Sequence, residues 1–295
     1  MFFSLLIVIY HHINQELEED RIPTSPRPIP CHSHNDYWRD RPVFSALEVG
    51  CVGIEADVWL RDGKLWVGHH WDELPPPGRR DMTFEKLYVE RLIWVLEERN
   101  DYNTTEGRWS RRGVYESDPS QTLVLMVDLK GEAEALWQPV LQELAPLRGR
   151  GWLTMYDGEK ASLGPITVVG TGNTDFKALT DNSSYRDIFF DAPVGRLDGS
   201  NFDRTNSYYA SASFGKELGF SFFGSLFPSQ SNKVKQQVRE AHKRGLKVRY
   251  WNEPQWMPWV TRWGWASLAD LGVDLLNVDD LVMFRKWYIR RQARK

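Results

Sequence analysis

The chain has 295 residues, of which 41% are hydrophobic and 26% charged, and its formal net charge is −3. This composition is ordinary for a globular protein, and the length suffices for one large barrel or two medium domains. The small net charge provides no strong positive field, so we expect no nucleic-acid partner.

The N-terminal stretch 1–10 is apolar. A membrane-spanning helix needs roughly 20 apolar residues, and no basic residues precede this run as they would in a signal peptide. Two interpretations stay open: a truncated signal anchor, or a segment that docks on a surface, and either allows membrane contact here. The following stretch is acidic and then proline-rich, which is typical of a linker. We therefore assign 1–28 to an N-terminal segment and linker.

From residue 29 onward, short apolar runs alternate with amphipathic segments, as in βα units that build a parallel sheet. The runs expected to form strands are 29–34, 52–60, 64–68, 121–129, 166–170, 187–191, 220–223, 246–251 and 273–278. The expected helices are 42–50, 83–99, 132–147, 233–244 and 265–271.

This alternation runs through 29–284 without a break in composition. About eight strands with intervening helices predict an α/β fold of the single (β/α)₈ barrel type. A doubly wound nucleotide-binding sheet is disfavoured because no GxGxxG motif follows the first strand. The last segment, 285–295, holds six basic residues and is expected to form a helix end and a solvated tail.

The chain contains two cysteines, Cys31 and Cys51. Two residues make neither a disulfide framework nor a zinc-ligand set. We expect two buried free thiols beside the first strands, and a single bridge between them is the alternative.

Carboxylates and imidazoles occur where the early strands end. Glu55 and Asp57 are two residues apart in an apolar run, so in a strand both point to the same face, and His32 and His34 have the same relation. Carboxylate oxygens on one face suit a hard divalent cation. A buried ion pair with a lysine or an arginine is the alternative, because buried acids need a partner.

In a barrel of this type, the carboxyl ends of the strands meet at one mouth. The polar and aromatic residues at these expected ends are His34, Glu55, Asp57, His69, Asp128, Lys130, Asp191 and Trp251. Lys130 is placed to neutralise a phosphate group, and two histidines on separate loops can act as acid and base. His69 is preferred to His70 because it directly follows a strand, whereas His32 remains an alternative to His34. Asp191 is expected to support the site or to cap a helix.

Several of these segments also carry a resemblance to a known family. They are 32–39 (HSHNDYWR), 53–60 (GIEADVWL), 66–69 (WVGH), 127–130 (VDLK), 190–193 (FDAP) and 272–274 (GVD). The chain resembles the phosphatidylinositol-phospholipase-C-like phosphodiesterases, which include glycerophosphodiester phosphodiesterases and sphingomyelinase D toxins. Within that superfamily it is similar to the fungal family called altered inheritance of mitochondria protein 6, over nearly everything after residue 29.

The resemblance implies a metal-dependent phosphoric diester hydrolase acting on a glycerophosphodiester or phospholipid-type substrate. His34 and His69 match the acid/base pair of the superfamily. Its metal ligands, for Mg²⁺ or Ca²⁺, are matched by Glu55, Asp57 and Asp128. A substrate-phosphate contact is matched by Lys130, and an aromatic wall of the pocket by Trp251.

The chain departs from the glycerophosphodiesterase pattern at three places, one of which is Trp251-Asn252-Glu253-Pro254 in place of their Trp-Thr-Val-Asn. Their His-Arg-Gly is His34-Asn35-Asp36 here, so one phosphate-binding arginine is missing, and Asp128 stands where a glutamate is usual, closer to the sphingomyelinase D pattern. The substrate therefore does not carry over from either relative.

The same residues leave two alternative functions to consider for this chain, another type of metal site and an inactive binding barrel. An amidohydrolase-type metal site would need further histidines on later strands, and beyond His70 the sequence has His242 alone, on an expected helix. The remaining alternative is a catalytically inactive barrel that binds phospholipid headgroups. The tryptophans of 256–265 are expected to pack a helix on the barrel, with a lipid-facing lip as the second interpretation.

The family name records an inheritance phenotype, so it does not support a mitochondrial location. The secretory pathway or membrane association is compatible with the apolar N-terminal stretch. We expect a phosphodiester or lipid headgroup as substrate and predict no protein partner.

Overall fold

The computed structural model describes residues 26–76, 80–221, 224–255 and 257–294. Within these residues, eight parallel strands form a closed barrel: β1 (Ile29–Ser33), β2 (Cys51–Arg61), β6 (Leu123–Leu129), β9 (Ile166–Gly172), β10 (Ile188–Pro193), β11 (Ser207–Ser213), β12 (Lys247–Trp251) and β13 (Leu275–Val278). The first strand, β1, pairs in parallel with both β2 and β13, and this pairing closes the ring. The prediction of a (β/α)₈ barrel is confirmed.

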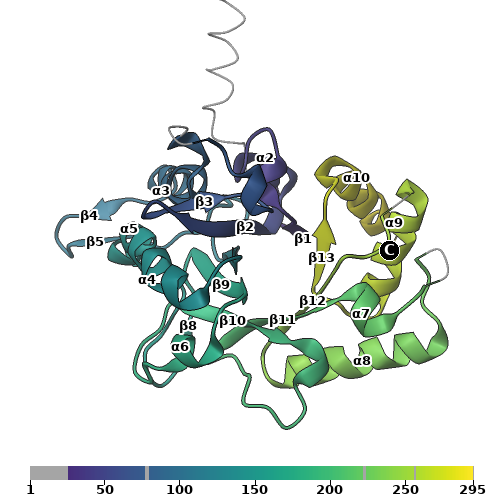
Figure 1. The fold of residues 1–295 in the computed structure, drawn as a ribbon. Helices are drawn as coiled ribbons and strands as arrows, with labels where there is room; N and C mark the ends of the chain where they lie inside the picture. The colour runs from purple at the N-terminus through teal and green to yellow at the C-terminus, as the bar shows by residue number, and fades with distance from the viewer. Residues whose placement is uncertain (1–25, 77–79, 222–223, 256, 295) are drawn as a thin grey trace, which may run out of the picture.

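Helices surround the barrel on its outer side (Figure 1). They are α2 (Phe44–Val49), α3 (Glu90–Glu97), α4 (Ala133–Glu143), α5 (Ala145–Gly149), α6 (Phe176–Thr180), α7 (Phe214–Leu218), α8 (Pro228–Lys243), α9 (Pro258–Asp270) and α10 (Leu281–Gln292). A π-helical turn over Glu85–Val89 leads into α3. Three further strand pairings extend the fold: β3 (Lys64–Val67) pairs antiparallel with β2, β4 (Tyr102–Asn103) with β5 (Arg108–Trp109), and β7 (Met155–Tyr156) with β8 (Ala161–Ser162).

The strand β6 shows how the sequence produces two layers of core. Its run Leu-Val-Leu-Met-Val-Asp-Leu is apolar on both faces, as expected for a strand covered on both sides. Leu125 and Val127 belong to the large cluster between strands and helices, whereas Val124 and Met126 belong to a small cluster with residues of other strands inside the barrel. Successive side chains point to opposite faces, so the polar residue that continues the inner series, Asp128, lies at the barrel mouth.

The sixth barrel strand is β11, Ser207–Ser213, so the expected strand at 220–223 is wrong. The sequence of β11 is Ser-Tyr-Tyr-Ala-Ser-Ala-Ser, whose small residues lack the β-branched aliphatic signal of a typical strand. Phe220 lies in a loop with 77% of its surface exposed. Residues 222–223 lie outside the described chain.

Cys31 and Cys51 form a disulfide, so the expectation of two free thiols is wrong. Cys31 lies on β1 and Cys51 begins β2, the neighbouring strand, and their Cα atoms are 4.7 Å apart. This separation falls within the range that a disulfide spans. Both residues are fully buried. The bridge joins two strands that each end at the barrel mouth.

The structure describes the two expected terminal segments to different extents. The apolar stretch 1–10 lies outside the described residues, and no described helix is long and apolar enough to cross a membrane. At the other end, α10 continues to Gln292 and so includes most of the segment 285–295 expected as a tail. Trp265 is buried against Phe284 of α10, as expected for helix packing, whereas 51% of Trp263 is exposed.

Candidate active site

The barrel mouth contains a cavity of about 360 Å³. Its lining residues are His34, Asn35, Glu55, His69, Asp128, Leu129, Lys130, Thr171, Gly172, Asn173, Arg249 and Trp251. Strand register explains why these residues meet, because Asp57 pairs with Asp128 across β2 and β6, and Asp128 pairs with Thr171 across β6 and β9. All of these positions point into the barrel at the same level, next to its carboxyl-terminal opening.

The three predicted metal ligands lie together. Glu55, Asp57 and Asp128 each offer an oxygen atom, and these atoms lie within 4.8 Å of one another. One oxygen of each aspartate, Asp57 Oδ1 and Asp128 Oδ1, is buried without a hydrogen-bond partner in the described chain. Buried polar atoms without a partner are rare in folded proteins. Three adjacent carboxylates, two of them with an unpartnered oxygen, fit a hard divalent cation.

Two cations of the chain already contact this cluster. Lys130 Nζ lies 3.0 Å from Asp57 Oδ2 and 2.7 Å from Asp128 Oδ2, and the Arg249 guanidinium lies 3.1 Å from Glu55 Oε2. The buried ion pair foreseen as the alternative is therefore present. Three carboxylates nevertheless outnumber the two cations, so the cluster retains negative charge.

Burial and mutual repulsion set the protonation of the carboxyl groups. Burial and the neighbouring Asp57 raise the pKa of Asp128 to about 6, although Lys130 opposes this shift. Burial and the charge of Glu55 likewise raise the pKa of Asp57. For Glu55, burial acts in the same direction, but the Arg249 charge and the hydrogen bond with His32 outweigh it and lower the pKa.

The predicted base or acid His69 is held by Asp57. Its Nδ1 atom lies 3.0 Å from Asp57 Oδ2, which also accepts a hydrogen bond of 2.9 Å from the Tyr37 hydroxyl. The backbone places His69 there, because the Gly68 amide donates to the Asp57 carbonyl and so continues the pairing of β3 with β2. The contact at Nδ1 leaves Nε2 as the ring atom available to a substrate.

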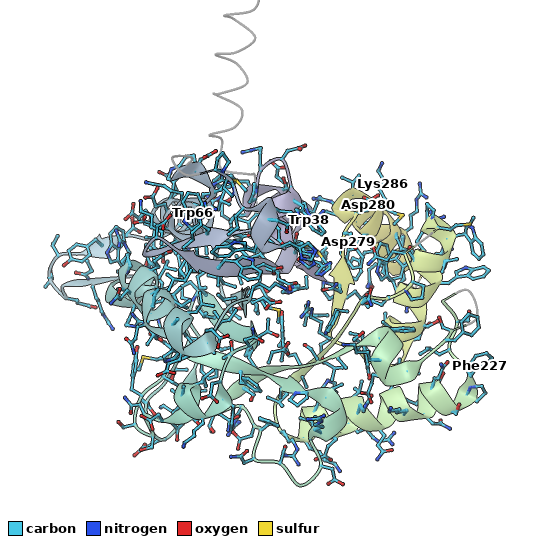
Figure 2. The ribbon with its side chains drawn as sticks, in the orientation of Figure 1. Trp38, Trp66, Phe227, Asp279, Asp280 and Lys286 are labelled. Carbon is cyan, nitrogen blue, oxygen red and sulfur yellow. A yellow bond between two sulfur atoms is a disulfide. The ribbon has the colours of Figure 1, made fainter. Side chains whose placement is uncertain are left out.

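His34 has a carboxylate partner on a different strand. Its Nδ1 atom lies 2.8 Å from Oδ1 of Asp279, the residue directly after β13. The backbone amide of His34 donates to the carbonyl of Val278, at the end of that strand. Burial lowers the pKa of His34, but the hydrogen bond to Asp279 and the charge of Glu55 outweigh burial and raise it. Trp38 packs edge-on against His34 and beside His69, and Figure 2 shows Trp38 and Asp279 close together at the opening.

The alternative histidines have different surroundings. His32 is fully buried inside the barrel, 3.4 Å from Glu55 Oε2, and burial together with the Arg249 charge lowers its pKa to about 4. It is therefore neutral near pH 7 and lies below the mouth. His70 is exposed beside the His69 ring.

The remaining predicted residues lie at the same opening. Trp251 ends β12 and lines the cavity. Asp191 is half-buried on the next strand, β10, and accepts a hydrogen bond of 3.0 Å from the Thr171 hydroxyl, so it supports the wall of the cavity. Burial raises the pKa of Asp191 to about 6.

A glycine next to Asp128 is required by the geometry of the site. Gly172 has a φ of +65°, which disfavours other residues, and a Cβ atom there would lie 1.9 Å from Asp128 Oδ1. The missing side chain therefore provides the space in which the Asp128 carboxylate lies.

Sequence reasoning missed Asp279, Arg249 and Tyr37 as members of this site. Asp279 directly follows the last strand and would have qualified by the same strand-end rule. Arg249 is a charged residue in the middle of an apolar run, which was an available signal for a buried ion pair. Tyr37 lies in a short 3₁₀ helix after β1 and had no comparable signal.

Comparisons with known proteins agree with this architecture. A family model described as the AIM6-like phosphodiesterase domain matches residues 21–191. The altered inheritance of mitochondria protein 6 homolog of Arthroderma benhamiae is 36% identical over 264 residues, covering 86% of this chain and 82% of the relative. The altered inheritance of mitochondria protein 6 of Eremothecium gossypii is 35% identical over 267 residues, with 85% and 67% covered. That of Saccharomyces cerevisiae is 35% identical over 282 residues, with 87% and 70% covered.

The names of these relatives refer to mitochondrial inheritance and state neither an enzymatic activity nor a location. The matched family model, in contrast, describes a phosphodiesterase domain. The chain belongs to the family of AIM6-like phosphodiesterase domains and has a phosphodiesterase-type fold.

Proposed function

We propose that this protein is a metal-dependent phosphoric diester hydrolase that uses His34 and His69 as its acid and base. The observation that carries the proposal is the arrangement at the barrel mouth. Two histidines line one cavity together with Glu55, Asp128 and Lys130, and each has an aspartate partner: Asp279 for His34 and Asp57 for His69. A phosphodiester needs proton transfer on both sides of the phosphorus atom and positive charge around its oxygens.

Glu55, Asp57 and Asp128 are the residues that would hold Mg²⁺ or Ca²⁺. The unpartnered buried oxygens of Asp57 and Asp128 and the excess of negative charge in the cluster support this assignment. When bound, a divalent cation stabilises the negative charge that builds up on the phosphoryl oxygens. Lys130, at the edge of the same cluster, contributes a second positive charge to the substrate phosphate.

His69 acts as the base in this proposal. Asp57 holds its Nδ1 side, so Nε2 takes the proton from a water molecule or from a hydroxyl group of the substrate. The nucleophilic oxygen forms a bond to phosphorus as the bond from phosphorus to the leaving oxygen breaks. Water as nucleophile yields a phosphomonoester and an alcohol, whereas a substrate hydroxyl yields a cyclic phosphate and an alcohol.

His34 acts as the acid. Its raised pKa favours the protonated ring, and Asp279 fixes the orientation from the Nδ1 side. The Nε2 proton then passes to the leaving oxygen as that oxygen gains negative charge. Trp38, packed beside both histidine rings, shields the two proton transfers from bulk water.

The test is a product assay on the full chain with glycerophosphocholine, lysophosphatidylcholine and bis(4-nitrophenyl) phosphate, followed by phosphorus NMR. We expect turnover of at least one diester, a loss of roughly 100-fold or more on chelation with EDTA, and recovery with Mg²⁺ or Ca²⁺. His34→Ala should cause a loss of similar size. His70→Ala is the matched control, because His70 is exposed and adjacent in sequence to His69, and should stay within a few-fold of the wild type.

Two results contradict the proposal. Turnover that is unaffected by both EDTA and His34→Ala removes the assigned machinery. Binding of these probes without any turnover supports the inactive, headgroup-binding barrel instead.

A further inference from the structure

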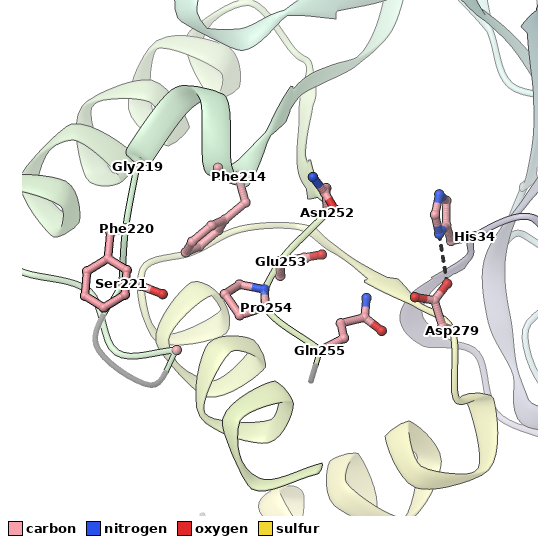
Figure 3. Close-up of a pocket in the computed structure, with 12 residues that line it drawn as sticks. His34, Phe214, Gly219, Phe220, Ser221, Asn252, Glu253, Pro254, Gln255 and Asp279 are labelled. Carbon is pink, nitrogen blue, oxygen red and sulfur yellow. Dashed lines mark hydrogen bonds and ion pairs between the residues drawn. The ribbon is translucent and has the colours of Figure 1, made fainter. Parts of the chain in front are cut away.

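A second cavity of about 740 Å³ opens beside His34, and no step of the proposed chemistry uses it. It lies between the α7 region and the loop that follows β12 (Figure 3). Its lining residues are His34, Phe214, Gly215, Gly219, Phe220, Ser221, Gly224, Asn252, Glu253, Pro254, Gln255 and Asp279. His34 lines both this cavity and the smaller catalytic one, so the two meet at the imidazole.

The chemistry of the lining changes with distance from His34. Figure 3 shows Asp279 and Gln255 at the end near the imidazole, and Phe214 and Phe220 at the far end. The polar end offers side-chain donors and acceptors, whereas the far end is aromatic. A ligand that fits both ends has polar oxygens next to the phosphate and an apolar group further away.

Glu253 lies between these two ends and is the unusual group of the cavity. Its side chain is buried, and neither carboxyl oxygen has a hydrogen-bond partner of good geometry in the described chain. Burial raises its pKa to about 8, and the nearby Arg249 charge and backbone amides offset this shift in part. The carboxyl is therefore neutral near pH 7 and carries an O–H donor with no acceptor of good geometry among the described residues.

We propose that this cavity is the specificity pocket for the organic group of the diester: it holds an acyl- or alkylglycerol group on the His34 side of the phosphate, with Glu253 donating a hydrogen bond to a glycerol or ester oxygen. The inference rests on the proposed function, because His34 is the point where phosphate and organic group are joined. The apolar chain then lies against Phe214 and Phe220, where removal of its methylene groups from water strengthens binding.

Gly215 allows a steric test of the pocket. It lies on α7 with an unstrained backbone, it is exposed, and a Cβ atom there meets no atom of another described element within 4 Å. Because Gly215 lines the cavity, Gly215→Leu is expected to add bulk at the cavity wall, and its Cβ atom meets no clash there. Gly149→Leu is the matched control, because Gly149 is an exposed glycine of α5 that also has no atom within 4 Å of an added Cβ and lines neither cavity.

The experiment is calorimetric titration of the full chain with octanoyl-lysophosphatidylcholine and with glycerophosphocholine, which has the same phosphodiester and no acyl chain. Titrations in EDTA suppress metal-dependent turnover, and parallel titrations in Mg²⁺ restore the cation. We expect the octanoyl ester to bind at least about 10-fold more tightly than glycerophosphocholine. Gly215→Leu should reduce this ratio to near one, and Gly149→Leu should leave it unchanged.

A second pair of variants tests the hydrogen bond. Glu253→Gln keeps a neutral donor and should bind both probes within about threefold of the wild type, whereas Glu253→Leu removes the donor and should weaken both by about 10-fold. If Glu253→Leu does not fold, the Gly215 and Gly149 variants still decide the assignment of the cavity.

Equal affinity of the wild type for the two probes, or an unchanged ratio in Gly215→Leu, overturns the proposal. The binding titrations report on the cavity and the product assay reports on hydrolysis, so each can fail alone. Selective binding of the octanoyl ester without turnover would retain the pocket and reject the hydrolase. Turnover with no selectivity for the acyl chain would retain the hydrolase and reject the pocket.

Discussion

The two histidine–aspartate pairs of the barrel mouth differ in how they are built. His69 and Asp57 are 12 residues apart: Asp57 lies on β2, and His69 lies just beyond the end of β3, the antiparallel neighbour of β2. His34 and Asp279, in contrast, are 245 residues apart and meet where the last strand closes the barrel on the first. The Asp57 side chain is fully buried and its Oδ2 atom is shared with Tyr37 and Lys130, but 41% of the Asp279 side chain is exposed.

This difference separates the two imidazoles chemically. His69 contacts Asp57, a member of the carboxylate cluster, so the electrostatic surroundings of its ring depend on the charge of that cluster. His34 is bound to a carboxylate at the rim and borders the larger cavity. The geometry therefore favours His69 beside the nucleophile and His34 beside the leaving group, and the predictions below test that division.

The largest expected effect comes from comparing leaving groups. A 4-nitrophenolate ion leaves without protonation, whereas an alkoxide must receive a proton. We expect His34→Asn to lower kcat about 100-fold or more with glycerophosphocholine but less than 10-fold with bis(4-nitrophenyl) phosphate, and His69→Asn to lower kcat by about 100-fold or more with both. Steady-state kinetics on the two substrates measure this pattern.

The opposite pattern would exchange the roles of the two histidines. In that case His69→Asn would lose less than 10-fold in kcat with bis(4-nitrophenyl) phosphate, and His34→Asn would lose about 100-fold or more with both substrates. Equal losses of both variants on both substrates would contradict any division between acid and base. His70→Ala serves as the control for changes in the loop after β3.

A stability effect of about 3 kcal/mol is expected from the disulfide, which ties the strand before His34 to the strand that carries Asp57. The cysteines are 20 residues apart, and closing a loop of this length stabilises the folded state by about 3 kcal/mol through the entropy of the unfolded chain. Cys31→Ala with Cys51→Ala should lower the free energy of unfolding by that amount in urea titrations.

Reductant provides the control for this prediction. Dithiothreitol should lower the urea midpoint of the wild type toward that of the double variant and leave the double variant unchanged. A wild-type midpoint that is insensitive to reductant under unfolding conditions would contradict a stabilising bridge.

Much of this site could be predicted from the sequence. Residues at the carboxyl ends of barrel strands meet at one mouth, and the strand ends follow from the alternation of apolar runs. That alternation predicted the barrel, and it placed His34, His69 and the three carboxylates at one opening, where the structure has them. The weak point was β11, whose serines and alanines fill a barrel wall without an aliphatic signal.

Other features depend on contacts that spacing does not encode. The closing Gly-Val-Asp segment drew attention to Asp274, which the structure places at the opposite end of the barrel, where it accepts hydrogen bonds from His242 and from the Val248 amide. The carboxylate that contacts His34 is Asp279, just beyond the other end of the same strand. The disulfide was missed for a similar reason, because two cysteines 20 residues apart bond only once β1 and β2 lie side by side.

The buried carboxyl of Glu253, in the cavity beside His34, makes the free energy of unfolding depend on pH. Burial raises its pKa from the ordinary value of 4.5 to about 8, so the folded protein keeps this proton through a range in which the unfolded chain releases it. The resulting stabilisation is complete below about pH 4.5 and is lost as the pH rises toward 8. Glu253→Gln cannot lose a proton, so it should match the wild type at pH 5 and exceed its free energy of unfolding at pH 8 by on the order of 2 kcal/mol.

Urea titrations of both proteins at the two pH values measure this difference. A difference that stays constant between pH 5 and pH 8 would show that the Glu253 carboxyl titrates normally. Glu240→Gln is a suitable control, since Glu240 lies on α8 outside both cavities and its exposed carboxyl is paired with Arg244.

The smallest expected effect is a shift in the pH profile caused by Asp279→Asn. The Asp279 carboxylate helps to raise the pKa of His34, and the substituted amide keeps a hydrogen-bonding group but removes the charge. His34 must be protonated to act as the acid, so activity falls as the pH rises through the pKa of this histidine. A lower pKa therefore moves the alkaline limb of kcat against pH toward lower pH, and activity above neutrality should fall by about 10-fold while activity at low pH changes little. With bis(4-nitrophenyl) phosphate, which needs no acid, the same variant should leave the alkaline limb in place. A loss that is uniform across pH and equal for both substrates would assign Asp279 a purely structural role and remove the distinction between the two pairs.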